Sequence, residues 1–341
     1  MTCASIIIYT LVLTLSGIPE EPASDVLVPS DVYRRIETCL LNSDYAAAEY
    51  EADLFISEHP DEPSGYLFKA SILQFRFFDF EDETRGEEYN NLLDTTLALS
   101  RKRSAEEPGS LWAQYYACAA QSLIGARTAA TGKLLQGVYR GRAGAMGMMR
   151  ILEKDPGLCD ASLMTGSYRF WKSVALGKLR LLPFIDDERE RGLAEVEHAI
   201  SCGKLNGPLS QTVLIEMLLD YDPVLAAERA EELTAAYPDC RLFLWQLGEA
   251  YKKLSRFEDA VRVFTGIAES VRADESDDGT GELRCWWKLA ELAKSVGKTG
   301  EYIYYCSRVV SFREQTSLSE RNRERVKKAQ DMLEDMAHDG R

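Results

Sequence analysis

The sequence predicts an all-α fold in which pairs of antiparallel helices stack into a superhelix. Between Leu244 and Ile267, large and small apolar residues fall at offsets of 3, 4, 7, 16, 20 and 23 from Leu244. The same offsets return 42 residues later, from Trp286 to Val309. Outside the N-terminus there is also no alternation of apolar with polar residues, so little or no β-sheet is expected.

This spacing resembles the tetratricopeptide (TPR) repeat, a helix–turn–helix unit of about 34 residues. The resemblance implies a right-handed solenoid of roughly six hairpins, because one such hairpin cannot bury its apolar face without neighbours. We place the TPR-like solenoid at 30–336, with its best repeats at 241–274 and 283–316, and a tail at 337–341. The amphipathic stretch 318–336 is expected to form a C-terminal capping helix.

The N-terminus predicts a targeting segment followed by a linker. Residues 1–18 are almost all apolar or small. The run is shorter than the ~20 residues that span a bilayer, which favours the core of a signal peptide over a membrane helix. The Pro-rich, acidic segment 19–29 is typical of a linker. We therefore expect a periplasmic or cell-envelope protein, with a cytoplasmic location as the alternative.

Capping residues and prolines divide the rest of the chain into helical segments. Ser30 and Asp31 are typical N-cap residues for the first helix. Prolines then follow successive units, at positions 60, 108, 156 and 238. The helical segments expected between these points are 63–78, 89–102, a long region from 111 to 154, 160–173, 192–199, 209–219 and 226–233.

Four glycines in the long helical region predict close helix packing. Gly137, Gly141, Gly144 and Gly147 are spaced by four, three and three residues, which does not fit the dinucleotide-binding pattern. On a helix they line one face, where the missing side chains let another helix approach. The nearby segment 125–133 also lacks the spacing of a phosphate-binding loop.

Charge is distributed unevenly along the chain. The net charge is −15, which argues against nucleic acid as a partner. Residues 108–152 nevertheless contain no Asp or Glu, and the longer segment 108–185 has ten basic and three acidic residues. Such a positive zone favours an anionic small molecule or lipid, and allows peripheral association with a membrane. The candidate anion-binding residues are Arg140, Arg142, Arg169 and Lys172. The alternative is that these cations pair internally with the acidic flanks.

The TPR resemblance also implies where a polypeptide would bind. Proteins of this family commonly bind partners on the concave surface lined by the first helix of each hairpin. The residues at those positions that we select as partner-binding are Leu242, Trp245, Glu249, Arg284, Trp287, Phe170 and Trp171. The alternative for the aromatic residues is ordinary core between repeats.

A second resemblance concerns the middle of the chain. Asp155-Pro156, the stretch 168–173, Leu182-Pro183-Phe184 and the stretch 242–245 occur in one order. Over roughly residues 105–310 this resembles a group of bacterial TPR proteins with no assigned activity. A looser likeness is to the periplasmic TPR proteins that accompany tripartite organic-acid transporters.

The residues predict no catalytic, metal or cofactor site. The three histidines, His59, His198 and His338, form no HExxH motif and no pair at i, i+4. The eight cysteines lie at least 21 residues apart, so neither a CxxC motif nor a disulfide framework is expected. The leading hypothesis is a non-enzymatic scaffold that binds a polypeptide in the concave groove. The alternative is a carrier or transporter-associated protein that binds an anion through segment 108–185.

Overall fold

The computed structural model describes residues 29–81, 83–181, 186–274, 279–315 and 318–339. The predicted signal peptide, 1–18, and all but the last residue of the predicted linker lie outside these ranges. Within them the chain forms fifteen α-helices, two short 3₁₀ helices and no strand, which confirms the all-α fold class. The α-helices are α1 (Ser30–Leu41), α2 (Tyr45–Glu58), α3 (Pro63–Phe80), α4 (Gly86–Glu106), α5 (Leu111–Ala130), α6 (Leu134–Lys154), α7 (Asp160–Ala175), α8 (Arg189–Cys202), α9 (Gln211–Tyr221), α10 (Pro223–Ala236), α11 (Arg241–Lys253), α12 (Phe257–Ala273), α13 (Thr280–Ser295), α14 (Thr299–Val310) and α15 (Glu320–Asp339). The 3₁₀ helices are η1 (Gly177–Leu181) and η2 (Pro208–Ser210).

Local sequence signals explain most helix boundaries. The side chain of Asp44 accepts a hydrogen bond from the backbone of Ala47 at 2.9 Å and caps α2, and Asp222 caps α10 in the same way. Pro63 occupies the first turn of α3, where its missing N–H costs no hydrogen bond. The N-terminal end of α1 differs from the prediction: Pro29 precedes the helix, and Ser30 lies within its first turn without capping it.

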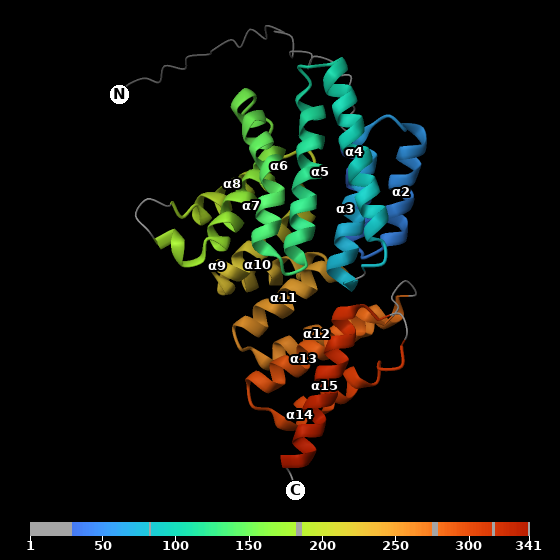
Figure 1. Ribbon diagram of the computed structural model, residues 1–341, viewed down its shortest axis with the longest axis vertical. Helices are drawn as coiled ribbons and strands as arrows, with labels where there is room; N and C mark the ends of the chain where they lie inside the picture. The colour runs from blue at the N-terminus through green and yellow to red at the C-terminus, as the bar shows by residue number, and fades with distance from the viewer. Residues whose placement is uncertain (1–28, 82, 182–185, 275–278, 316–317, 340–341) are drawn as a thin grey trace, which may run out of the picture.

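Consecutive helices pack against one another as a stack of hairpins (Figure 1). Helices α2 to α6 stand side by side in one half of the molecule, and α11 to α14 cross below them. Helix α15 packs on α13 and α14, as predicted for a C-terminal capping helix. Among the described helices, none has the length and apolar composition required to cross a membrane.

The long helical region expected from residue 111 is two helices, which the glycines hold close together. The chain reverses at Gly132, whose φ of 83° suits glycine far better than other residues. A Cβ atom on Gly125 of α5 would lie 2.6 Å from the Cα of Gly141 on α6, and one on Gly137 would lie 2.6 Å from the backbone of Ala129. The predicted glycine face is therefore confirmed, and it turns the opposite face of α6 away from α5.

The stack also closes on itself, which local patterns did not predict. Helix α3 contacts α11 and α13, so two regions more than 160 residues apart lie side by side (Figure 1). Nearby, the Oγ of Ser43 donates to the carbonyl of Asp239 and accepts from the backbone N–H of Arg241, both at 2.9 Å. The buried carboxylate of Glu37 accepts from the N–H of Leu209 at 3.0 Å. The N-terminal hairpins therefore pack against helices from the C-terminal half of the chain.

Candidate functional site

Three of the residues predicted to contact a partner lie in the interior. Leu242 is 5% exposed, Trp245 is 4% exposed and Phe170 is fully buried. The prediction of an open groove is therefore corrected at these positions, and the alternative, core between helices, holds. On α11, the physical reason is that the C-terminal end of α3 covers the side where the groove was expected; Phe170 lies instead where α7 packs closely against α8.

Asp79, in the last turn of α3, accounts for the burial of Trp245. Its carboxylate is fully buried and accepts hydrogen bonds from Trp245 Nε1 at 2.7 Å, Arg241 Nε at 2.7 Å and the hydroxyl of Tyr45 at 3.1 Å. Arg241 also pairs with Asp274 at 2.7 Å. A buried carboxylate requires such partners, because without them its loss of hydration is not compensated. The cluster therefore fixes the end of α3 against α11.

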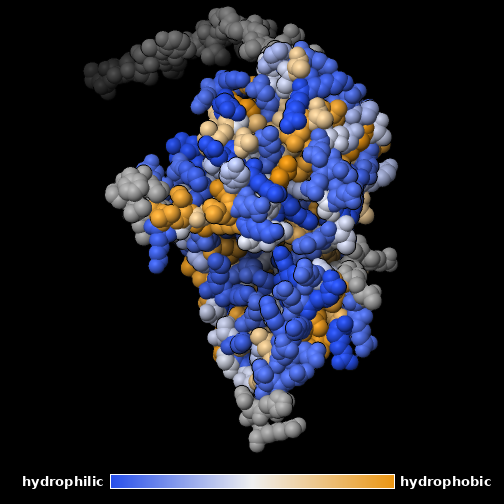
Figure 2. Space-filling model, viewed as in Figure 1, coloured by the Kyte–Doolittle hydropathy of each residue, from blue (hydrophilic) through white to orange (hydrophobic). Residues whose placement is uncertain are grey.

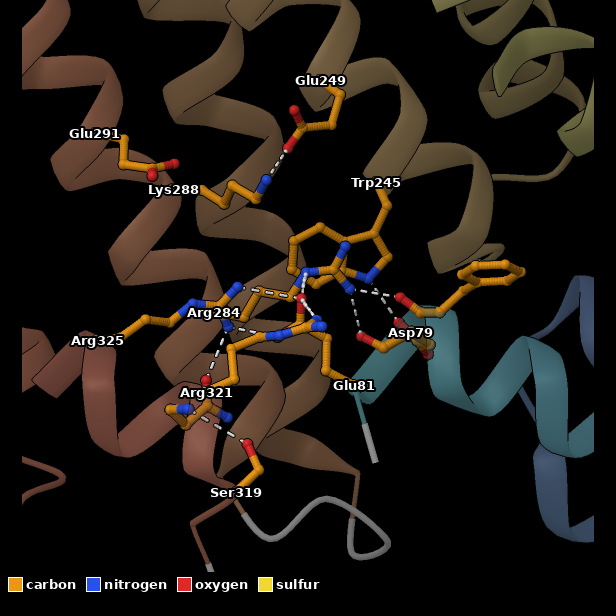
Figure 3. A network of polar contacts seen from close by, with 12 residues as sticks. Asp79, Glu81, Trp245, Glu249, Arg284, Lys288, Glu291, Ser319, Arg321 and Arg325 are labelled. Carbon is orange, nitrogen blue, oxygen red and sulfur yellow. Dashed lines mark hydrogen bonds and ion pairs between the residues drawn. The ribbon is translucent and has the colours of Figure 1, made fainter. Parts of the chain in front are cut away.

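Glu81, just after α3, holds a second cluster of charges at the same junction (Figure 3). Arg284 of α13 approaches its carboxylate to 3.4 Å and Arg321 of α15 to 3.5 Å, and Arg325 donates to it as well. Burial raises the pKa of Glu81, but the guanidinium groups of Arg284, Arg325 and Arg321 outweigh it and lower that pKa to about 2. Arg284 also lies over the ring of Trp245, 3.9 Å from its centroid, and donates to the carbonyl of Asp79 at 3.2 Å.

The predicted groove thus holds a segment of the same chain. The carboxylates of Asp79 and Glu81 and the last carbonyls of α3 occupy the donors of Trp245, Arg241 and Arg284. A second polypeptide could take this place only if α3 moved away.

The remaining predicted groove residues stay partly exposed. Glu249 forms an ion pair with Lys288, with 2.8 Å between Oε1 and Nζ. Trp287 is half-buried and packs against the core. Trp171 is also half-buried and packs edge-on to Phe170, with ring centroids 5.1 Å apart. Trp171 and Trp287 lie on different helices that are not consecutive in the stack, α7 and α13.

The predicted anion-binding residues divide into two pairs. Arg169 pairs with Glu188 at 2.5 Å and with Glu195 at 3.1 Å, and Lys172 pairs with the other oxygen of Glu188. Burial raises the pKa of Glu188, but the bonds from Lys172 and Arg169 lower it further than burial raises it. For Arg169 and Lys172 the alternative therefore holds, because both cations are satisfied inside the chain.

Arg140 and Arg142 are exposed, and no acidic partner faces either of them in the described part of the chain. Arg140 also lines an open pocket of about 210 Å³ at the tip of the α5–α6 hairpin. Arg127 and Lys133 line the same pocket together with Thr128 and Thr131, and the described lining includes no Asp or Glu. Arg127 is held by packing over the ring of Phe77, 3.5 Å from its centroid. Three cations, Arg127, Lys133 and Arg140, therefore line this pocket.

The face of α6 opposite the glycines combines exposed apolar and basic side chains. We call it the outer face of α6; it consists of Leu135, Tyr139, Arg142, Met146 and Arg150. These residues recur at offsets of 4, 7, 11 and 15, so they form one stripe along the helix. Leu135 is 71% exposed, Tyr139 77% and Met146 40%, which is unusual for large apolar side chains on one helix. In Figure 2, hydrophobic surface is most extensive over the region of α7 to α9, and the surface over α11–α15 is mostly hydrophilic. The sequence already shows apolar and basic residues at helical spacing opposite the glycines, but only the glycines were interpreted, as a packing face.

The structure also contains a disulfide bond that the sequence analysis did not expect. Cys159, at the start of α7, is joined to Cys202, in the last turn of α8. Five other cysteines in the described part of the chain are free. The expectation of no disulfide was based on spacing along the chain, and 43 residues separate this pair. In a helical hairpin, however, the start of the first helix lies beside the end of the second.

No model of a known protein family matches this chain, and no curated protein matches it either.

Proposed function

We propose that this protein is a TPR-like, non-enzymatic interaction scaffold whose outer face of α6 binds an acidic polypeptide segment. The proposal retains the scaffold function expected from the sequence but moves the binding surface, because α3 occupies the concave side. We also retain export to the cell envelope of a bacterium as part of the proposal; it depends on residues 1–18 and on the TPR resemblance.

The observation that carries the proposal is the exposed stripe itself. Leu135, Tyr139 and Met146 offer apolar contacts, and Arg142 and Arg150 alternate with them along the same face. Aromatic residues and arginines are the side chains most often found at the centres of protein interfaces. Segment 108–152 contains no Asp or Glu, and Glu153 near the C-terminal end is the only acidic residue of α6, so Arg142 has no acidic residue within a turn of it on its own helix. The complementary partner is a segment with acidic residues interleaved with apolar ones.

The pocket at the hairpin tip lies on another side of α6 and offers further cations. Arg140 follows Tyr139 in sequence and lines the pocket with Arg127 and Lys133. A volume of about 210 Å³ accommodates one carboxylate side chain or chain end. An acidic segment that continues around the end of α6 would place one carboxylate there, next to these cations.

The test uses the full chain and a defined probe. A fluorescently labelled helical peptide with Glu and Leu on one face is titrated with the protein, and a peptide with Lys in place of Glu serves as its counterpart. We expect the anisotropy to rise with the acidic peptide only, and the affinity to fall as salt is added. The double variant Leu135→Ala/Tyr139→Ala and the variant Arg142→Glu should both weaken binding. The matched control is Tyr50→Ala/Leu54→Ala, which removes two exposed apolar residues from α2.

Two results would overturn the proposal. One is equal binding of the acidic peptide by wild type and by the α6 variants. The other is binding of the wild type to phosphatidylglycerol vesicles but not to either peptide, which would assign the face to an anionic membrane.

The pocket supports a second candidate function, binding of a small anion. Lys133 and Arg140 line it together with Arg127, and this basic lining favours a dicarboxylate or phosphate. Calorimetry with succinate and with inorganic phosphate tests this, with Lys133→Ala/Arg140→Ala as the variant. Saturable binding that the variant abolishes, without any peptide binding, would favour the carrier function over the scaffold.

A further inference from the structure

The end of the α7–α8 hairpin gathers two sulfur atoms and an imidazole. Cys159 precedes the first turn of α7, and His198 and Cys202 lie four residues apart on the last turns of α8. The Sγ of Cys202 lies 3.7 Å from Nε2 and 3.9 Å from Nδ1 of His198. One ligand atom from each of the three residues lies within 4.8 Å of the other two.

We propose that these three residues, when the disulfide is reduced, bind a zinc-like divalent cation, so that the metal and the disulfide compete for the same two sulfurs. This site is separate from the outer face of α6 and does not depend on the proposed scaffold function.

The spacing of the atoms fits a tetrahedral ion. With Zn–S bonds of ~2.3 Å and Zn–N bonds of ~2.0 Å, neighbouring ligands in a tetrahedron are about 3.8 Å apart for two sulfurs and about 3.6 Å apart for a sulfur and a nitrogen. The sulfur–nitrogen separations of 3.7 and 3.9 Å already lie near that value. The sulfur of Cys159 lies within 4.8 Å of a nitrogen of His198, and breaking the disulfide lets this sulfur move away from that of Cys202 to complete the spacing.

The hairpin keeps the ligands near one another without the disulfide. The carboxylate of Asp160 accepts the backbone N–H of Leu205 at 2.6 Å and that of Lys204 at 3.0 Å, which ties the start of α7 to the chain after α8. Gly166 and Gly192 bring the two helices into close contact, since a Cβ on Gly166 would lie 2.5 Å from the carbonyl oxygen of Gly192. The Cα atoms of the two cysteines are 5.8 Å apart. The ligands are therefore organised by the fold.

Exposure and charge also suit an ion that exchanges with solvent. His198 and Cys202 are exposed, so a metal held there would keep a fourth position for water or an external thiol. Cys159 sits at the N-terminus of α7, where the helix dipole favours a thiolate.

The redox step involves a dithiol as the reductant. A dithiol thiolate attacks one protein sulfur and releases the other as a thiolate; the second thiol of the reductant then displaces the attacked sulfur from this mixed disulfide, and a cyclic disulfide leaves. The protein disulfide thereby takes up two electrons and two protons. Binding of the divalent ion to the two resulting thiols releases both protons.

The experiment compares one protein in two redox states. Full-length protein is reduced with a dithiol, freed of reductant without oxygen, and titrated with Co²⁺ and then Zn²⁺. We expect thiolate-to-cobalt charge-transfer absorption with one ion per chain, lost when zinc is added. The same protein oxidised with diamide, with its disulfide verified by mass spectrometry, should show none. This comparison needs no variant, so a folding defect cannot explain it.

Variants then identify the ligands. Cys159→Ser and Cys202→Ser should abolish the absorption, and His198→Ala should weaken zinc binding by roughly tenfold or more. Cys39→Ser is the matched control, because Cys39 is a half-buried free cysteine on α1. Binding that persists in the oxidised protein, or reduced protein that binds no ion, would overturn the proposal. Binding unaffected by His198→Ala would overturn the three-ligand site.

Discussion

The indole nitrogen of Trp245 donates a 2.7 Å hydrogen bond to Asp79, a carboxylate 166 residues earlier in the chain. This bond joins α11 to the end of α3 inside the protein, where neither partner is accessible to water. A hydrogen bond to a buried charged group contributes more to stability than one between neutral groups.

Removing this bond is expected to destabilise the fold. Trp245→Phe should lower the free energy of unfolding by roughly 2 kcal/mol, because it leaves Asp79 with one donor fewer. Asp79→Ala should cost roughly 3–5 kcal/mol, since it also leaves the charge of Arg241 only partly paired. Urea denaturation measures both. Trp287→Phe is the control, being half-buried outside this cluster; an equal loss in both Trp variants would contradict the anchoring role of the bond.

Glu81 is expected to make the protein sensitive to acid. Its pKa in the folded protein is about 2, below the ordinary value of 4.5, so its contribution is complete above about pH 4.5 and is lost as the pH falls toward 2. At 1.36 kcal/mol per pKa unit, that contribution is roughly 3 kcal/mol. Urea midpoints between pH 7 and pH 3 should fall more steeply in the wild type than in Glu81→Gln. Parallel curves for the two proteins would show that Glu81 does not carry the effect.

Two glycine-to-alanine substitutions should change the free energy of unfolding in opposite directions. Gly125→Ala places a Cβ 2.6 Å from the backbone of Gly141, so α5 and α6 must move apart, at a cost of roughly 1–3 kcal/mol. Gly266→Ala, on the exposed side of α12, meets no atom within 4 Å and should stabilise the protein by roughly 0.5–1 kcal/mol. Thermal unfolding distinguishes them, and a stabilising Gly125→Ala would refute the close packing.

In the basic segment, replacing an ion-paired arginine should destabilise the protein more than replacing an exposed one. Arg169 is 16% exposed at its side chain and pairs with Glu188 and Glu195, so Arg169→Ala should cost roughly 2 kcal/mol or more. Arg142 is exposed, and Arg142→Ala should change stability by less than about 0.5 kcal/mol. Chemical denaturation of both variants tests the contrast. A large loss from Arg142→Ala would indicate an internal role and weaken its assignment to the outer face of α6.

The sequence predicted what depends on neighbouring residues. Apolar offsets located α11 to α14, and the glycine spacing identified the face of α6 that packs on α5. Burial of Trp245 could not be predicted, because its partner Asp79 comes from a distant helix and repeat offsets do not encode the curvature of the stack. Counting charges along the sequence also could not show that Arg169 is ion-paired whereas Arg140 is exposed, since both lie in the same basic segment. The proximity of Cys159 and Cys202 could have been predicted, because the start of one helix and the end of the next lie side by side in an antiparallel hairpin.

The contact between α3 and α11 also restricts how this chain can fold and diversify. In a linear repeat protein each unit interacts only with its neighbours, so units unfold separately and can be duplicated or lost. Here an added or deleted hairpin between α3 and α11 would separate Asp79 from Trp245. The number of hairpins in that interval is therefore fixed by the closure. The closure also requires chain segments far apart in sequence to meet during folding, which is expected to slow folding and to make unfolding more cooperative than in an open array.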